Sequence, residues 1–367
     1  MKANQWSVSL LIAAILLTAS PVWAGTRVLI TVDVESYANG NPEVQVWGRV
    51  GQGEHGITRI MDMLDARSMK GTFFLTPYDA GKFGEITMAE AARAIDGRGH
   101  DLQLHTHPAP MYEVWGMSQA SLAHQTEILS QGIAMLERWT GKRPLAHRAG
   151  GYLANLDTLE ACRRLGLRVD ASLSPAAPGT QLPVQIGASN SMKEVNGVLE
   201  LPVTYYVQAG IGSWRSLRIV DIEASTLKEL QTIVRQARDA QLPTVSVMMH
   251  SFSFVRDGKV HYDVEKRLGD FLDFLAAEPG IEVTTVSKLH DDWSRGRINI
   301  DNGTDVVPYT GWWLTYLRAV EDIDKGRKNI AVAMLPPIGI LFIVAGIALL
   351  RRRRRQSTMR AASAQST

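Results

Sequence analysis

The stretch GHDLQLHTHPAP, Gly99 to Pro110, combines the pattern of a β-strand with ionisable side chains at the strand's end. Leu102 and Leu104 alternate with polar residues, which is the period of two that is typical of a strand. The polar face holds Asp101, Gln103, His105 and His107. His105 and His107 therefore lie on the same side, directly before a proline-rich turn. The pattern raises the possibility of a metal site at the end of a strand.

Strand and helix patterns alternate on both sides of this stretch. The expected strands are Arg27–Glu35, Gly71–Thr76, Asp101–His107, Pro144–Arg148, Leu167–Ser172, Val198–Tyr206, Pro243–Phe252 and Ile281–Ser287. The expected helices are Gly56–Lys70, Thr87–Asp96, Ser118–Trp139, Asn155–Gly166, Ser225–Ala240 and Asp263–Ala277. Strands that alternate with helices predict a parallel sheet with helices outside it. About seven strands in a body of this length favour an α/β fold, a closed or nearly closed (β/α) barrel, over two domains.

Two of the expected helices have an N-terminal signal. Thr87 with Glu90, and Thr226 with Glu229, have the three-residue spacing of a capping box. We expect these two helices to begin at those threonines.

Composition excludes several classes of protein. The 367 residues have a formal net charge of +2, and five consecutive arginines, Arg351–Arg355, supply much of the positive charge. No basic stripe crosses the body of the chain, so the sequence predicts no nucleic-acid partner. Cys162 is the only cysteine, which excludes an intramolecular disulfide.

The N-terminal segment has the pattern of a secretory signal. Residues 1–24 begin with Lys2, continue through an apolar run and end in short side chains at Val22 and Ala24. We expect cleavage after Ala24, with an uncleaved N-terminal anchor as the alternative.

The C-terminal segment has the pattern of a membrane span. Ala331–Leu350 is an uncharged run about as long as a bilayer is thick, and the arginine cluster follows it. We expect a single pass through a bacterial inner membrane, with the body periplasmic or otherwise extracytoplasmic. The alternative is a sorting tail that a peptidase removes. The expected segments are a signal at 1–24, a barrel at 25–290, a membrane-proximal stem at 291–328, a transmembrane helix at 329–350 and a basic cytoplasmic tail at 351–367.

Ionisable residues collect where the expected strands end. They are Asp33, Glu35, His105, His107, Arg148, Asp170 and His250. Because burying an unpaired charge costs several kcal/mol, these groups are expected to contact one another or a cation. One carboxylate and two imidazoles make a three-ligand metal site with a position left open for water. Asp33 could then act as general base with Arg148 holding it ionised, and His250 as general acid with Asp170 orienting it.

These residues resemble the polysaccharide deacetylase superfamily, which is NodB-like and includes carbohydrate esterase family 4. The matching pieces are TVDVES, HTHPAP, HRAGGY, VDASLS and MMHSFSF, in the family's order from Thr31 to Phe254. The resemblance implies a distorted (β/α) barrel of NodB type and a zinc cofactor, with another divalent transition metal as the alternative. It also implies hydrolysis of the carbon–nitrogen bond of an N-acetylated sugar in a glycan.

Carried over to this chain, the resemblance assigns the catalytic base to Asp33. The family more often has two adjacent aspartates, and here Val34 fills the second place. Alternation along a strand turns Val34 away and Glu35 toward the face of Asp33, so Glu35 is the expected metal carboxylate. The family more often spaces its histidines four apart, but that position after His105 is an alanine. The expected metal ligands are therefore Glu35, His105 and His107, with His55 and His147 as spare candidates.

The remaining motifs assign the rest of the site. Arg148, Asp170 and His250 match catalytic residues of the family. The glycines after Arg148 let the backbone approach a ligand, so the amide of Gly151 or Tyr152 is the expected oxyanion donor. Three alternatives stay open: an O-acetyl esterase, a small-amide hydrolase on the same scaffold, and a glycan-binding protein with impaired catalysis.

Overall fold

The computed structural model describes residues 25–36, 40–300 and 305–324. The expected signal, transmembrane segment and basic tail lie outside these residues. Within the described part of the chain, no helix has both the length and the apolarity that crossing a membrane requires. The chain divides into a main body, built from the described residues up to Val207 together with Leu217–Tyr309, and a second unit, built from Gln208–Ser216 and the described residues from Thr310 onward.

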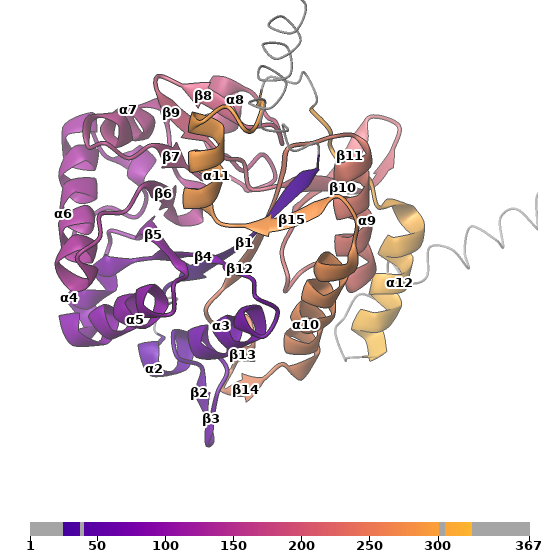
Figure 1. Ribbon diagram of the computed structural model, residues 1–367, viewed down its shortest axis with the longest axis horizontal. Helices are drawn as coiled ribbons and strands as arrows, with labels where there is room; N and C mark the ends of the chain where they lie inside the picture. The colour runs from indigo at the N-terminus through magenta and orange to yellow at the C-terminus, as the bar shows by residue number, and fades with distance from the viewer. Residues whose placement is uncertain (1–24, 37–39, 301–304, 325–367) are drawn as a thin grey trace, which may run out of the picture. The chain divides into compact units, whose positions relative to one another are not determined.

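The main body is built on a nine-stranded sheet in the order β12-β1-β4-β5-β6-β7-β9-β8, with β15 also beside β1 (Figure 1). The strands are β1 (Thr26–Val34), β4 (Thr72–Leu75), β5 (Asp101–Thr106), β6 (Ala146–Ala149), β7 (Val169–Asp170), β8 (Lys193–Val195), β9 (Val198–Glu200), β12 (Thr244–His250) and β15 (Ile281–Thr284). Neighbours pair in parallel except β8 with β9. Every residue of β1 is buried, as in a sheet covered on both faces.

The sheet is a curled, mostly parallel half-barrel, which is consistent with the distorted (β/α) barrel, closed or nearly closed, that the sequence led us to expect. The expected strand Val198–Tyr206 is interrupted at Pro202, which has no N–H to donate to a ladder. It divides into β9 and β10 (Tyr205–Ile211), and β10 pairs instead with β11 (Trp214–Ile219). At β12 the contacts are isolated ones: Thr204 N donates to Ser246 O at 3.3 Å, Ser246 N donates to Thr204 Oγ1 at 2.8 Å, and Asp221 forms a single bridge with Met248.

The longer helices lie where the 3.6-residue pattern predicts them. They are α3 (Ile57–Asp65), α5 (Glu85–Gly97), α6 (Leu122–Thr140), α7 (Leu156–Arg164), α9 (Leu227–Asp239) and α10 (Tyr262–Ala277). The capping box of Thr226 and Glu229 is confirmed, because each side chain bonds the other's backbone N–H. The prediction of a capping box at Thr87 and Glu90 is wrong. Gly84, with a φ of 88°, turns the chain so that α5 begins at Glu85.

Short elements connect this framework. They are the helices α2 (Pro42–Gln45), α4 (Ala80–Phe83) and α8 (Leu182–Ile186), the hairpins β2 (Arg49–Val50) with β3 (Gly53–Glu54) and β13 (Val255–Arg256) with β14 (Lys259–Val260), and 3-10 turns at Pro77–Asp79, Met117–Gln119 and Gly150–Tyr152.

The expected end of the barrel at residue 290 falls inside a helix. Helix α11 runs from Val286 to Ser294, and Arg27 of β1 lies 3.7 Å from Asp292 within it. Ile298 and Ile300 are also buried in a hydrophobic cluster of the main body. The body therefore extends at least ten residues past the expected boundary, because apolar residues after α11 cover the sheet.

The second unit joins the tip of the β10–β11 hairpin to α12 (Gly311–Asp324). Trp312 Nε1 donates to Gly210 O at 3.1 Å, and its ring stacks on Trp214 with centroids 6.3 Å apart. Thr315 Oγ1 donates to Gln208 O at 3.1 Å.

Candidate active site

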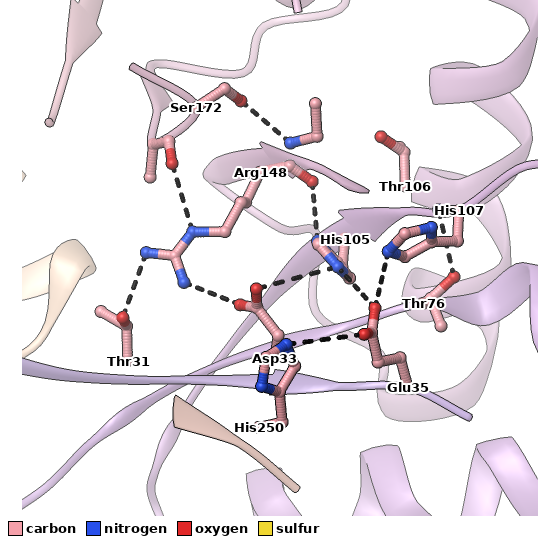
Figure 2. Close-up of polar contacts among 12 residues, drawn as sticks. Thr31, Asp33, Glu35, Thr76, His105, Thr106, His107, Arg148, Ser172 and His250 are labelled. Carbon is pink, nitrogen blue, oxygen red and sulfur yellow. Dashed lines mark hydrogen bonds and ion pairs between the residues drawn. The ribbon is translucent and has the colours of Figure 1, made fainter. Parts of the chain in front are cut away.

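The register of the parallel sheet brings the expected site residues to one edge. Asp33 at the end of β1 is opposite His250 of β12, and His105 of β5 is opposite Arg148 of β6. Side chains at the carboxyl ends of parallel strands converge above the sheet. Figure 2 shows Asp33, Glu35, His105, Arg148 and His250 directed toward one another from these strands.

Glu35, His105 and His107 form a candidate metal centre. Glu35 Oε2 lies 3.0 Å from His105 Nε2 and 2.7 Å from His107 Nε2 (Figure 2). One donor atom from each residue lies within 4.8 Å of the other two. Burial alone would raise the pKa of Glu35. The positive charge of His107 and the hydrogen bonds from both imidazoles instead hold it well below its usual range.

The donor set fits a divalent transition metal. His105 Nδ1 bonds the main-chain carbonyl of Arg148 at 2.9 Å. Because a carbonyl only accepts, Nδ1 carries a proton, so a cation would be bound through the lone pair of Nε2, and metal-ligating histidines usually have such a second partner. Two imidazoles and one carboxylate leave a position open for water or substrate, and the His107 side chain is 27% exposed.

Asp33 and Arg148 form a buried ion pair beside this centre. Arg148 Nη1 donates to Asp33 Oδ1 at 2.7 Å, and Asp33 Oδ2 lies 3.9 Å from His105 Nε2. The guanidinium also donates to Thr31 Oγ1 at 3.1 Å and to Ala171 O at 3.2 Å. Its carbon lies 4.2 Å from the centre of the Phe74 ring. Arg148 therefore has one rigid position, and Asp33 takes its orientation from it.

His250 is opposite Asp33 in the register of β1 and β12, and its hydrogen-bond partner is a residue that the sequence did not reveal. His250 Nε2 lies 3.7 Å from Glu35 Oε1, and Nδ1 lies 3.3 Å from Glu223 Oε1. Burial opposes protonation of His250, but the bond with Glu223 and the charges of Glu35 and Asp33 raise its pKa to about 9. Glu223 also accepts a bond of 2.7 Å from Ser253 Oγ.

The expectation that Asp170 orients His250 is wrong. Asp170 of β7 is opposite His147 of β6 in the register. Its side chain therefore lies on the face of the sheet that points away from Arg148. His147 Nδ1 bonds Asp170 Oδ1 at 2.6 Å, and His147 Nε2 bonds Thr106 Oγ1 at 2.9 Å. His147 and Asp170 also lie close to Cys162. Both ring nitrogens of His147, however, already have hydrogen-bond partners. His147 is therefore separate from the metal candidate.

His55, the other spare candidate, is also elsewhere. Its Nδ1 lies 3.1 Å from Glu265 Oε2 in α10. The described residues that group around Glu35 as metal donors are His105 and His107 alone.

The turn Gly150–Tyr152 follows β6 and lies against His107. A Cβ on Gly150 would be 2.4 Å from the His107 ring, so any side chain there would displace the ring. Gly151 and Tyr152 have φ values of 57° and 60°. Donation by the amide of Gly151 or Tyr152 to an oxyanion stays a prediction.

A pocket of about 190 Å³ opens beside the metal candidate. It is lined by Glu35, Ser36, Asp79, Lys82, His107, Ala109, Pro110 and Trp115. Trp115 is 63% exposed and its edge faces His107, with ring centroids 6.5 Å apart. Burial, reinforced by the charge of Glu35, raises the pKa of Asp79 to about 6, although Asp79 accepts a bond from Ser36 N.

Comparisons with known proteins agree with this arrangement. Residues 29–169 match the family model described as polysaccharide deacetylase. A search of curated proteins found no match.

Two solved structures with TM-scores of 0.54 and 0.50 share the fold. A protein from Mycobacterium smegmatis, provisionally assigned as a polysaccharide deacetylase, has a TM-score of 0.54 and 18% identity over 77% of this chain and 94% of its own. A 4-alpha-glucanotransferase from Thermococcus litoralis has a TM-score of 0.50 and 11% identity over 78% of this chain and 42% of its own. A carbohydrate esterase 4 family pseudoenzyme from Bacillus anthracis has a TM-score of 0.42 and 14% identity over 72% and 65%.

The five sequence motifs, the matched region and the residues gathered at the end of β1 agree on one assignment. Over residues 29–169 the chain matches the polysaccharide deacetylase family, and its fold is similar to that of the Mycobacterium smegmatis protein.

Proposed function

We propose that this protein is a metal-dependent hydrolase that removes N-acetyl groups from an extracytoplasmic or cell-envelope polysaccharide. The family supports deacetylase activity. The observation that carries the finer proposal is the position of Glu35. Its carboxylate contacts both His105 and His107, and the Asp33–Arg148 pair and His250 lie next to this group.

Glu35, His105 and His107 would hold the cation, most simply zinc. When bound, it supplies Lewis acidity toward the acetyl carbonyl and the attacking water. Asp33 accepts the proton of that water, and the bond from Arg148 holds its carboxylate in position. The water oxygen bonds the carbonyl carbon, and an amide of Gly151 or Tyr152 donates to the carbonyl oxygen.

His250 completes the reaction as general acid. It gives a proton to the sugar nitrogen as the carbon–nitrogen bond breaks, and acetate and a free amine leave. The bond to Glu223 keeps His250 charged and aimed for this step. Asp33 lies 3.9 Å from His105 and His250 lies 3.7 Å from Glu35, so a group that takes a proton and a group that gives one are both next to the metal candidate.

The pocket beside the metal candidate has room for a sugar ring. The exposed face of Trp115 offers an apolar surface for the C–H groups of a pyranose, while Asp79 and Ser36 offer polar contacts.

The N-terminal and C-terminal patterns support a body outside the cytoplasm, held by the segment 329–350. Protease treatment of intact and permeabilised cells tests that location. Digestion of the body only after the inner membrane is permeabilised would refute it.

The metal content of the full-length protein tests the centre. We expect about one zinc per chain in the wild type and none in the double variant His105→Ala/His107→Ala. The matched control His124→Ala, on α6, should keep its zinc. Absence of metal from the wild type after growth with added zinc would refute the mechanism.

Acetate release tests the reaction. We expect release from N-acetylated oligosaccharides and much less from O-acetylated ones. The reverse preference would identify an O-acetyl esterase, and metal binding without release from either substrate would identify a glycan-binding protein.

A further inference from the structure

The side chain of Tyr152 combines deep burial with an unsatisfied hydroxyl. Tyr152 is 7% exposed, and its ring packs with Val203 and Met248. Its hydroxyl oxygen is buried and has no hydrogen-bond partner among the residues that the structure describes. Buried hydroxyls nearly always have a partner, because leaving one without costs free energy. This exception therefore needs a physical explanation.

The backbone of Tyr152 is unfavourable as well. Its φ of 60° lies in the left-handed region, which aromatic residues rarely adopt. It follows Gly151, which has a φ of 57°, so two successive left-handed residues turn the chain at the end of β6. Such strain persists where the surrounding structure imposes it, and it is concentrated at functional sites. The strain and the orphaned hydroxyl occur at one residue, four positions after Arg148.

The surroundings of the hydroxyl are the charged groups of the candidate site. The charges of Asp33, Arg148, Asp221 and Glu35 all act on it. Asp221 has no role in the proposed reaction. Its carboxylate accepts hydrogen bonds from the backbone N–H groups of Glu223 and Ala224. The packing of Tyr152 on Met248 places it beside β12, the strand that ends in His250. The hydroxyl is thus within electrostatic range of the candidate site's charged groups and has no hydrogen-bond partner among the described residues.

We propose that the Tyr152 hydroxyl donates a hydrogen bond to the acyl oxygen of the substrate while negative charge develops on that oxygen. This inference rests on the proposed hydrolase function and adds a side-chain donor to the backbone amide. Tyrosine forms no covalent bond and keeps its proton throughout. Burial and the neighbouring carboxylates raise the pKa of Tyr152, so the group stays a donor at neutral pH. A substrate oxygen is the partner that the free enzyme lacks.

The variant Tyr152→Phe tests the proposal because catalysis and stability should change in opposite directions. Removing a donor to a developing oxyanion typically lowers kcat by about 10²–10³-fold. We expect that loss with KM changed less than about threefold and with metal content unchanged. The variant keeps the ring and removes only the orphaned hydroxyl, so its unfolding midpoint should be equal to or higher than that of the wild type.

The matched control is Tyr78→Phe. Tyr78 is equally buried, but its hydroxyl donates to Ile128 O at 2.7 Å. We expect this variant to lose stability and to keep its kcat. If Tyr152→Phe keeps kcat within about twofold, or if its stability and kcat fall together, the hydroxyl is structural and the inference is wrong. If the wild type itself releases no acetate, the proposed function fails first, and that result is distinct because it precedes any comparison of variants.

Discussion

Arg148 contacts His105 through its main chain and Asp33 through its side chain. The Arg148 carbonyl accepts a bond of 2.9 Å from His105 Nδ1, and its guanidinium donates to Asp33 Oδ1 at 2.7 Å. One fully buried residue therefore orients a candidate metal ligand and the proposed base. The two contacts can be separated experimentally, because a substitution removes the side chain and keeps the carbonyl.

Arg148→Ala should destabilise the protein by about 3–5 kcal/mol, because it leaves the Asp33 carboxylate buried and unpaired. Adding Asp33→Asn should recover part of this loss, since the amide carries no charge. Both variants should still bind metal through the preserved carbonyl contact to His105. Urea unfolding and metal analysis check these outcomes. The control Arg164→Ala removes an exposed pair with Glu160 and should cost less than about 1 kcal/mol. A loss as small for Arg148→Ala would contradict the prediction.

Glu223→Gln should lower kcat by about 10–100-fold while leaving the metal content unchanged. The substitution weakens the partner that aims and charges His250, and Glu223 is not among the donors grouped around Glu35. The informative comparison is Asp170→Asn, which breaks a buried bond to His147 and should reduce stability more than kcat. Steady-state kinetics and thermal unfolding measure both. A larger kcat effect at Asp170 than at Glu223 would show that the sequence-based assignment was right after all.

These two acidic residues show where sequence reasoning works and where it fails. The convergence of Asp33, His105 and Arg148 could be predicted, because the carboxyl ends of parallel strands meet at one edge. Asp170 also ends a strand, but register turns it to the opposite face. Register between strands is not readable from either strand alone.

Glu223 could not be found because no periodic pattern marks its segment. It follows Ile222, whose N–H donates to Met248 O of β12 at 3.1 Å, so a long-range contact places it. The same limit applies to the break at Pro202 and to the extent of α11. In each case tertiary contacts, not local preference, decide where an element begins or ends.

Gly150→Ala should weaken metal binding more than it weakens the fold. The added Cβ would lie 2.4 Å from Cε1 and 2.6 Å from Nε2 of His107, so the ring has to move away from Glu35. We expect about 10–100-fold lower zinc affinity, measured by competition with a chelator. The control Gly97→Ala lies near the end of α5 with nothing within 4 Å of its Cβ, and it should leave zinc affinity unchanged. Equal affinities in the two variants would show that His107 does not bind the metal.

Acid should destabilise the main body through His100, which contacts Asp65 and Gly71. Its Nε2 lies 3.4 Å from Asp65 Oδ1, and its Nδ1 accepts the Gly71 N–H at 3.2 Å. Burial lowers the pKa of His100 to about 4. The charge of Asp65 opposes this shift, and the charges of Lys70 and Arg98 reinforce it.

The pKa of His100 is thus lower in the folded state than the value of 6.5 in the unfolded chain. Between pH 6.5 and 4 the unfolded chain binds more protons, so stability from this group is complete above 6.5 and falls as the pH falls toward 4. The slope can reach about 1.4 kcal/mol per pH unit.

His100→Gln cannot take up the proton and keeps an acceptor for Gly71. Its free energy of unfolding, from urea titrations at pH 7, 5.5 and 4.5, should therefore fall less steeply than that of the wild type. The pKa of Asp65 is lowered to about 2, so its own effect begins below this window. Parallel slopes for the two proteins would show that His100 is not the group responsible.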